Sequence, residues 1–282
     1  MSEREDGELR KLQMVLLDIL KMLDRFCEEN GITYFLDSGT ALGAVRHAGF
    51  IPWDDDVDVG MLREDYDRFI ELAKEGLPEG YSLHQFDDTP GFAAMFAKIY
   101  KDGTVFETEE SRSASCPQCV FVDVFPYDAL SSDKKERERQ LACANKWQKI
   151  SYLYHSAHVT LPSMPAAARA VVGAGCHVVH FGLHAGLKRE SIRRKFDQAR
   201  VFSASPSDEL SVLSYTAWGP FDRELLTNLE RRSFEGCMFP CPADFDRYLT
   251  TLYGPTWREL PPPEQRRTHK PLRLVLSAAE EG

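Results

Sequence analysis

Three aspartates that alternate with apolar residues are the first sign of chemistry in this sequence. Asp54, Asp56 and Asp58 lie within the segment Ile51–Met61, and alternate side chains of a β-strand share one face of the sheet. The apolar residues around them indicate a partly buried strand, where neighbouring carboxylates are costly unless a cation neutralises them. Because carboxylate oxygens are the ligands that Mg²⁺ prefers, the pattern predicts a divalent metal site. A solvated acidic loop is the alternative.

A calcium-binding loop that begins at Asp54 is excluded by its spacing. The EF-hand pattern needs glycine at its sixth position and glutamate at its twelfth, where this chain has Val59 and Asp65. Pro52 and Trp53 would also end an entering helix poorly. The acidic segment therefore points to magnesium rather than calcium.

Two further segments place polar residues beside apolar ones. Ser38, Gly39 and Thr40 form a turn between a predicted strand and a predicted helix, where backbone N–H groups can hold a phosphate. Downstream, Asp123 is the single carboxylate in the apolar strand 120–125, although a side chain that simply points outward would explain it as well.

In this order the three segments resemble the polymerase-β-type nucleotidyltransferase fold, and more closely the LicD family. That family includes bacterial phosphocholine transferases and, more distantly, fukutin and the fukutin-related protein. The most specific matches are LDSGTALGAVRH at 36–47 and GFIPWDDDVDVGM at 49–61. Shorter matches are Lys98–Ile99, Asp102–Thr104, Val122–Pro126, Phe234–Gly236, Tyr248–Leu249, Tyr253–Gly254, Leu260–Pro262 and His269. The resemblance covers most of 12–270 and is weakest over 134–203.

The resemblance implies an enzyme that transfers a phospho-substituent, usually phosphocholine, from a CDP-linked donor such as CDP-choline. The acceptor would be a hydroxyl of a cell-surface glycan, lipopolysaccharide or teichoic acid, or of its lipid-linked precursor, and CMP would be released. Two other functions stay open. A nucleotidyltransferase would attack the α-phosphate of a nucleoside triphosphate and release pyrophosphate, and a non-catalytic module would only bind a nucleotide or glycan.

The same resemblance assigns roles to individual residues. Asp56 and Asp58 would be ligands of Mg²⁺ or Mn²⁺, Asp54 a further ligand or a neighbour of the ligands, and Asp123 either the third ligand or the base. The candidate contacts to phosphate or acceptor are Ser38, Gly39, Thr40, Arg46, His47, Lys98 and His269. For the charged ones a surface salt bridge is the alternative. Trp53 is expected to pack in the interior rather than to stack on a ligand.

The periodicity of the chain predicts the elements that position these residues. An apolar stripe at spacings of three and four predicts a helix that ends near Asn30–Gly31. Further helices are expected over 41–48, 63–75, 134–155 and 165–202, and strands over 32–36, 56–61, within 81–106, and over 120–125, where Pro126 should end the strand. The predicted fold is α+β, a mixed sheet flanked by helices with a mostly helical C-terminal half. One domain would span 1–270, with a core over 9–130, a helical portion over 131–254 and an extended tail over 255–282.

Charge and composition bound the partners and the compartment. The 282 residues include 34 Lys and Arg against 44 Asp and Glu, a net charge of −10, which argues against a general nucleic-acid binder. Met1–Arg10 lacks the apolar run of an export signal, and 165–187 carries an arginine, three histidines and four glycines, unlike a spanning helix. We therefore expect a cytoplasmic protein, with peripheral association at the inner face of the membrane as a further hypothesis.

The seven cysteines and a histidine-rich stretch offer two more metal sites. Without an export signal the cysteines are expected to be reduced thiols, although Cys116 and Cys119 could join Cys237 and Cys241 around a zinc ion. Three histidines share one face of a predicted helix, with two more nearby: His177, His180 and His184, then His155 and His158. No carboxylate joins their spacing, so an amphipathic or membrane-facing surface is the preferred interpretation.

Overall fold

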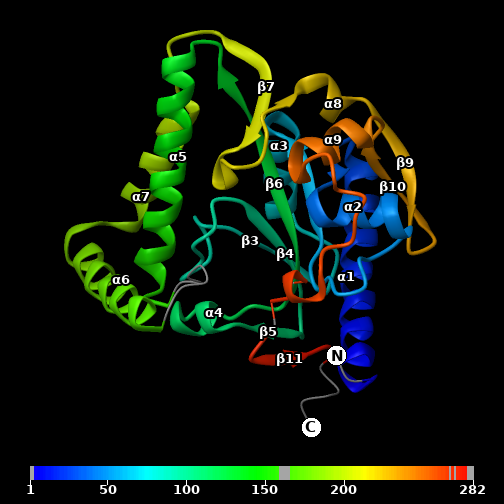
Figure 1. Cartoon of the computed structure of the whole chain (residues 1–282), viewed down its shortest axis with the longest axis horizontal. Coiled ribbons are helices and arrows are strands. Elements are labelled where there is room, and N and C mark those ends of the chain that lie inside the picture. Colours follow the sequence, from blue (N-terminus) through cyan, green and yellow to red (C-terminus); the bar gives the residue numbers. More distant parts are fainter. Residues whose placement is uncertain (1–2, 159–165, 267, 270, 278–282) are drawn as a thin grey trace.

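A mixed β-sheet built around one long strand organises the molecule (Figure 1). The computed structural model describes residues 3–158, 166–266, 268–269 and 271–277. In these residues β2 (Asp58–Leu62) runs parallel to β6 (Val120–Ser131), and the other pairings are antiparallel. The strand order is β1-β2-β6-β4-β3, and β7 joins β6 to β8. The expected mixed sheet flanked by helices is confirmed, whereas its relation to the polymerase-β type and the single-domain boundaries stay predictions.

The remaining strands extend this sheet or form two separate two-stranded sheets. The other strands are β1 (Phe35–Leu36), β3 (Tyr81–His84), β4 (Ala97–Lys101), β5 (Val105–Glu107), β7 (Pro206–Val212), β8 (Phe221–Asp222), β9 (Leu229–Phe234), β10 (Cys237–Pro242) and β11 (Arg273–Val275). The α-helices are α1 (Glu3–Asn30), α2 (Ser38–His47), α3 (Arg63–Glu75), α4 (Glu109–Ser113), α5 (Lys134–His155), α6 (Ala166–Gly186), α7 (Arg189–Asp197), α8 (Arg223–Thr227) and α9 (Phe245–Tyr253). Short 3₁₀ turns lie at Gln198–Arg200, Leu213–Tyr215 and Pro263–Gln265.

Strand β6 continues through Pro126, so the prediction that this proline ends the strand is wrong. Val120–Val124 pairs with β4, and pairing with β7 begins at Tyr127. Pro126 therefore lies between the stretch of β6 that pairs with β4 and the stretch that pairs with β7. Its missing N–H removes no hydrogen bond from either of these two pairings. As a result the strand carries Asp123 in one half and Asp128 in the other.

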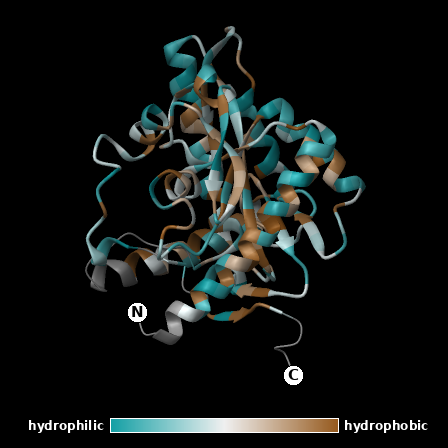
Figure 2. Cartoon of the chain, turned by 90° about the vertical axis from the view of Figure 1, so that its right-hand side faces the viewer, coloured by the Kyte–Doolittle hydropathy of each residue, from teal (hydrophilic) through white to brown (hydrophobic). Residues whose placement is uncertain are grey.

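The core lies between the central strands and the helices that contact β6, which are α1, α3 and α5. Figure 2 shows the apolar residues concentrated along the central strands. The stripe predicted for α1 is buried as expected, with Leu16, Ile19, Leu20 and Leu23 at most 1% exposed. The bounds predicted for 63–75 and 134–155 are those of α3 and α5. Helix α2 begins three residues before its predicted start, because the Asp37 carboxylate accepts a hydrogen bond from the Ser38 N–H and caps it.

The C-terminal half is less helical than predicted. Strands β7, β8, β9 and β10 occupy much of 206–242, where a mostly helical chain was expected. β9 and β10 form a hairpin whose two turn residues, Glu235 and Gly236, both have positive φ, as a tight type I′ turn requires. The single helix predicted over 165–202 is two helices, because α6 ends at Gly186 and α7 begins at Arg189. Pro165 lies outside the described residues. In the described part of the tail, a 3₁₀ turn lies at Pro263–Gln265 and β11 pairs with β5.

Glycine 60 in β2 has no room for a side chain. A Cβ atom there would lie 2.5 Å from the Phe35 ring and 2.8 Å from the Tyr127 ring. We predict that Gly60→Ala lowers the free energy of unfolding by about 2 kcal/mol, because both buried rings must shift. A chemical denaturation curve measures this. Gly173→Ala, where nothing lies within 4 Å, is the matched control, and equal effects at the two positions would contradict the packing explanation.

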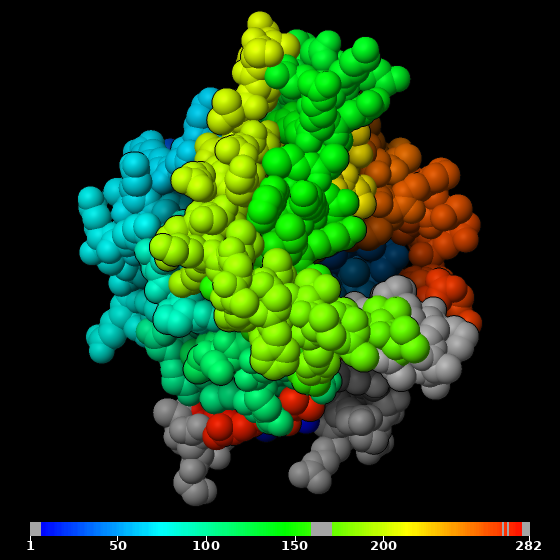
Figure 3. All heavy atoms as spheres, turned by 90° about the vertical axis from the view of Figure 1, so that its left-hand side faces the viewer, coloured from blue at the N-terminus to red at the C-terminus, as the bar shows by residue number. Residues whose placement is uncertain are grey.

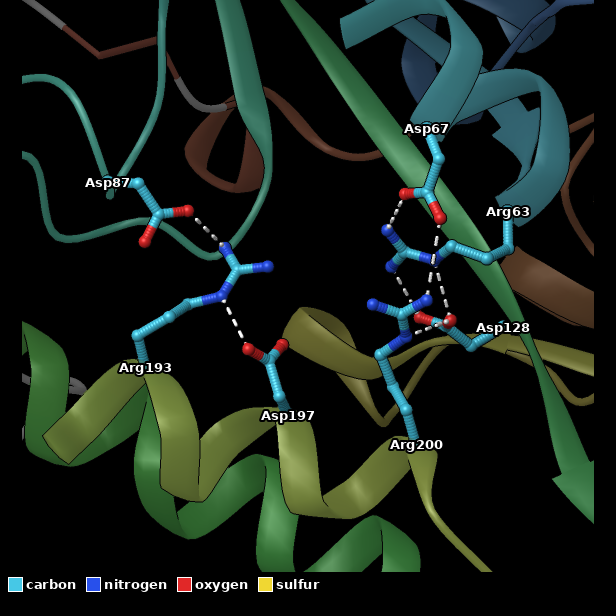
Figure 4. Close-up of polar contacts among 7 residues, drawn as sticks. All are labelled: Arg63, Asp67, Asp87, Asp128, Arg193, Asp197 and Arg200. Carbon is cyan, nitrogen blue, oxygen red and sulfur yellow. Dashed lines mark hydrogen bonds and ion pairs between the residues drawn. The ribbon is translucent and has the colours of Figure 1, made fainter. Parts of the chain in front are cut away.

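A cluster of charged side chains joins α3, β6 and the turn after α7 (Figure 4). Arg63 binds Asp128 through two hydrogen bonds of 2.8 Å, and Arg200 contacts the same carboxylate at 3.3 Å. Asp67 lies on the exposed side of the cluster, 3.0 Å from Arg63. Although burial alone would lower the pKa of Arg63, the adjacent Asp128 carboxylate raises it. The Arg63 guanidinium therefore stays charged inside the protein.

Candidate active site

Three neighbouring strands place Asp58, Asp123 and Lys98 in one row across the sheet. Asp58 is directly opposite Asp123 in the parallel β2–β6 pair, and Lys98 is opposite Asp123 in the antiparallel β4–β6 pair. Directly paired residues share a face of the sheet, and Lys98 Nζ lies 2.8 Å from Asp123 Oδ1. All three side chains are buried. The structure thus brings together two aspartates that lie in separate segments of the sequence.

The other predicted aspartates lie in a loop rather than in the strand. β2 begins at Asp58, so the expectation that Asp54, Asp56 and Asp58 alternate along one strand is wrong for the first two. The loop is nevertheless fixed. The Gln13 side chain donates to the Asp54 carbonyl at 3.0 Å, and the Asp58 N–H donates to the Thr40 hydroxyl at 2.9 Å. The loop carboxylates are buried or half-buried, which also rules out the solvated-loop alternative.

His269 reaches this loop from the C-terminal segment. Its backbone N–H donates to Asp55 Oδ2 at 2.7 Å, and its Nδ1 lies 3.0 Å from Asp55 Oδ1 and 3.7 Å from Asp56 Oδ2. The contact with Asp55 is the main cause that raises the pKa of His269 to about 9, so the imidazole is protonated at neutral pH. Asp55 itself was not predicted, because on an ideal strand it would have faced away from its neighbours.

The carboxylates of this cluster repel one another. Burial raises the pKa of Asp54, Asp56, Asp58 and Asp123. The negative charges of Asp56 and Asp123 raise the pKa of Asp58 further. Lys98 partly offsets this at Asp123. The cluster therefore gathers five carboxyl groups, Asp54, Asp55, Asp56, Asp58 and Asp123, around two cationic partners, Lys98 and His269.

This donor set fits a hard divalent cation by its chemistry. Its ligand atoms are carboxylate oxygens, which suit Mg²⁺ or Mn²⁺, and it contains no thiolate. Within the described ranges no three His, Cys, Asp or Glu side chains already converge in a coordinating arrangement. Lys98 and His269 contact Asp123 and the Asp55–Asp56 pair instead. The metal site stays a prediction, which the gathering of carboxyl groups supports.

A second buried carboxylate lies beside the cluster and was missed by the sequence analysis. Asp37 is 0% exposed, and its carboxylate accepts hydrogen bonds from the hydroxyls of Tyr127, at 2.9 and 3.0 Å, and Tyr248. Burial raises the pKa of Asp37, while these hydrogen bonds lower it. Its N–H donates to the Asp58 carbonyl at 3.0 Å, so the network fixes α2 against β2.

The predicted phosphate turn is the first turn of α2. The Thr40 hydroxyl accepts from Asp58, and the Ser38 hydroxyl donates to Asp37 at 3.1 Å, so both serve internal contacts. Gly39 is half-buried against Asp54, whose Oδ2 would lie 3.2 Å from an added Cβ. The start of α2 therefore adjoins the acidic loop, with Gly39 as its accessible residue.

Arg46, His47 and Trp53 are the other three candidates, and their contacts lie outside the row of Asp58, Asp123 and Lys98. Arg46, near the C-terminal end of α2, donates to the Trp257 carbonyl at 3.2 Å and to His47 at 3.0 Å. The guanidinium of Arg266 lies 4.4 Å from the centre of the Trp53 ring. These contacts join α2 and the acidic loop to the C-terminal segments.

A cleft with a cavity volume of about 190 Å³ opens beside Asp123 and Lys98. Glu110 and His155 line this cleft. Much of its wall is formed by aromatic side chains: Phe92, Phe96, Phe106, Phe121, Tyr152 and Tyr215. Lys98 Nζ lies 3.2 Å from the centre of the Phe121 ring, so this wall already holds one ammonium group by a cation–π contact. No sequence motif predicted this cleft, because the aromatic residues that line it come from distant parts of the chain.

His155 in the cleft wall gives the fold a pH dependence. Burial lowers its pKa to about 4, below the usual 6.5, so as the pH falls the unfolded chain takes up the proton first. Its contribution to stability is complete above pH 6.5 and is lost as the pH falls towards 4. From pH 7.5 to pH 5 we predict that the wild type loses about 2 kcal/mol more unfolding free energy than His155→Gln. Urea denaturation at both pH values tests this, and parallel losses would contradict it.

Neither alternative metal site forms in the described part of the chain. All seven cysteines are free thiols, and the four proposed zinc ligands do not form a cluster. On α6, His180 Nδ1 lies 2.8 Å from the Leu153 carbonyl, and His184 stacks on Tyr154. These histidines therefore pack against α5.

Comparison with known proteins now adds the family. Residues 31–165 match the family model described as "LicD/FKTN/FKRP, nucleotidyltransferase domain". The "Lipopolysaccharide cholinephosphotransferase LicD" of Haemophilus influenzae is 27% identical over 275 residues, 93% of this chain and 95% of that protein. The human "Ribitol 5-phosphate transferase FKRP" is 53% identical over 100 residues, and the mouse "Ribitol-5-phosphate transferase FKTN" 34% over 74. These two matches cover 36% and 26% of this chain, but only 18% and 16% of the relatives.

The chain is therefore a transferase of the LicD type. Residues 31–165 match the LicD family domain, as the motifs indicated, and the chain is similar over 93% of its length to a LicD transferase. The family match spans α2, the acidic loop, β2, β4 and β6, the elements that carry the Asp58–Asp123–Lys98 row. None of the described helices is long and apolar enough to cross a membrane.

Proposed function

We propose that this protein transfers phosphocholine from CDP-choline to a hydroxyl of a cell-surface glycan or of its lipid-linked precursor. The observation that carries the proposal is the row of Asp58, Asp123 and Lys98 beside an aromatic cleft. Phosphoryl transfer depends mainly on positioning and on charge stabilisation, and this row supplies both signs of charge at one place. The choline phosphotransferase name of the Haemophilus relative supports the choice of substituent.

The reaction balances as a single substitution at phosphorus. The acceptor oxygen bonds to the phosphorus that carries choline, and the bond from that phosphorus to the bridging oxygen breaks. The bridging oxygen leaves with the electron pair as part of CMP. Asp123 is the carboxylate of the acidic cluster that lines the cleft, so it is placed to take the proton of the hydroxyl. Lys98, 2.8 Å from Asp123, is placed to neutralise the transferred phosphate.

The remaining carboxylates would hold the metal. The Mg²⁺ or Mn²⁺ ligands would be Asp56 and Asp58, with Asp54 as a further ligand or a neighbour of the ligands. Asp123 would lie at the edge of this site. The ion would supply positive charge to the diphosphate. Gly39, at the start of α2 and against Asp54, is placed for close approach of a phosphate to the backbone.

The lining of the cleft supports choline phosphate as the carried group. A trimethylammonium group is bound by the faces of aromatic rings together with a carboxylate. Phe121, Tyr152 and Tyr215 line the cleft along with Glu110.

Product analysis with purified protein tests the proposal and its alternatives. CMP released from CDP-choline in the presence of Mg²⁺, abolished by EDTA and restored by added Mg²⁺, is the expected result. Pyrophosphate from CTP would instead identify a nucleotidyltransferase, and nucleotide binding without turnover of either substrate would identify a binding module. CMP release from CDP-ribitol, and not from CDP-choline, would keep the reaction but overturn the choice of substituent.

A further inference from the structure

Helix α6 exposes its apolar side chains to solvent. Of the eleven large apolar side chains that are exposed among the described residues, five lie on this helix: Val171, Val172, Val178, Val179 and Phe181. Val171 and Val178 are each 73% exposed, and Phe181 is 70% exposed. Figure 3 shows α6 on the outer surface of the molecule, next to α5 and α7.

The opposite side of α6 is the one that packs. Cys176, His180, Leu183 and Leu187 recur at spacings of three and four and are half-buried, and the helix contacts α5. His180 is bound to the Leu153 carbonyl of α5 at 2.8 Å. The helix thus has a packed face and a second apolar face of valines and Phe181 that is open to solvent, where a helix that only covers a core would carry polar side chains. Such an outward apolar face marks an interaction surface.

The charge around α6 identifies its partner. Residues 139–189 contain six Lys and Arg and no Asp or Glu, a charge of +6, so the rest of the chain carries −16 (−10 − 6). Lys146 and Lys149 on α5 and Lys188 after α6 are exposed. A protein surface that combines apolar side chains with an excess of cations suits the headgroup region of a bilayer containing anionic lipids.

We propose that α6 lies on the surface of an anionic membrane, with Val171, Val178 and Phe181 in the apolar region beneath the headgroups. The helix does not cross the bilayer. It adjoins the cleft, because the ring of His158 lines the cleft and lies 5.2 Å from the ring of His177. Membrane binding would therefore hold the cleft at the bilayer surface. The binding itself does not depend on the proposed function.

Vesicle sedimentation with the full chain tests this proposal. The wild type is expected to pellet with phosphatidylglycerol–phosphatidylcholine vesicles and much less with phosphatidylcholine alone. The Val178→Asp, Phe181→Asp double variant should bind at least about tenfold less. Met238→Asp with Leu260→Asp is the matched control, because both residues are exposed, at 50% and 54%, lie outside α6 and add the same charge. This control should bind like the wild type.

Fluorescence gives a second test that does not require a disruptive charge. The emission of Phe181→Trp should shift to shorter wavelength on addition of anionic vesicles, and that of Met238→Trp should not. Wild-type protein that stays in the supernatant, or a control that binds as weakly as the α6 variant, would overturn the proposal. So would a wild-type dimer in sedimentation velocity that the α6 substitutions convert to monomer, since a second copy would then occupy this face.

Discussion

Asp58→Asn is expected to lower CMP release from CDP-choline by at least about 10³-fold, because a central carboxylate of the proposed metal site is lost. It should leave the fold intact. In the wild type, burial together with the charges of Asp56 and Asp123 raises the pKa of Asp58, so its ionised form costs folding energy. The neutral amide removes that repulsion, and the melting temperature should stay the same or rise. Loss of activity without loss of stability is the signature of a functional carboxylate.

Two comparisons make this result interpretable. Asp56→Asn combined with Asp58→Asn should be inactive as well, and substantial turnover by that double variant would contradict the site. Glu79→Gln changes an exposed carboxylate outside the cluster and should retain wild-type turnover. The Mg²⁺ concentration for half-maximal activity should rise in any Asp58 variant with residual turnover, which a purely structural role would not cause.

Asp128→Ala is expected to lower the free energy of unfolding by about 3–5 kcal/mol, the typical cost of breaking a buried ion pair from one side. The Asp128 side chain is 5% exposed, and its removal leaves the guanidinium of Arg63, 17% exposed, without its bidentate partner. Urea or thermal denaturation measures the loss.

The same cluster supplies the control. Asp67 contacts Arg63 at 3.0 Å but is 52% exposed, so Asp67→Ala should cost less than about 1 kcal/mol. Replacing both buried partners, Arg63→Met with Asp128→Leu, should recover much of the loss, because the Arg63 charge is removed with its partner and Arg200 keeps its contact with Asp67 at 3.5 Å. If Asp128→Ala were no more harmful than Asp67→Ala, the Arg63–Asp128 pair would not contribute as we infer.

The sequence predicted the site best where it depends on strand pairing. The apolar stretches around Asp58 and Asp123 predict strands, and a sheet brings such strands together, so their proximity followed from local pattern and family motif. The alternation argument failed at Asp54 and Asp56 because β2 begins only at Asp58. There the loop conformation is set by distant partners such as Gln13.

Contacts between distant segments could not be predicted. Tyr248 reaches Asp37 across 211 residues, and the cleft combines Phe121 with Tyr215. Neither contact has a local signal in the sequence. The strands of 206–242 were missed for a related reason. β9 (Leu229–Phe234) is mostly polar and exposed, so it lacks the apolar alternation that identifies a strand with one buried face. The glutamate–glycine pair of its hairpin turn was the available cue.

The long separation between the acidic loop and His269 has a consequence for biosynthesis. His269 follows Asp123 by 146 residues (269 − 123), and β11 anchors its segment to β5. A ribosome adds about 5–20 residues per second, so His269 is synthesised roughly 7–30 s after Asp123. During that interval Lys98 offsets part of the charge of the acidic pocket but His269 does not, so magnesium in the surrounding solution can enter the pocket before His269 docks.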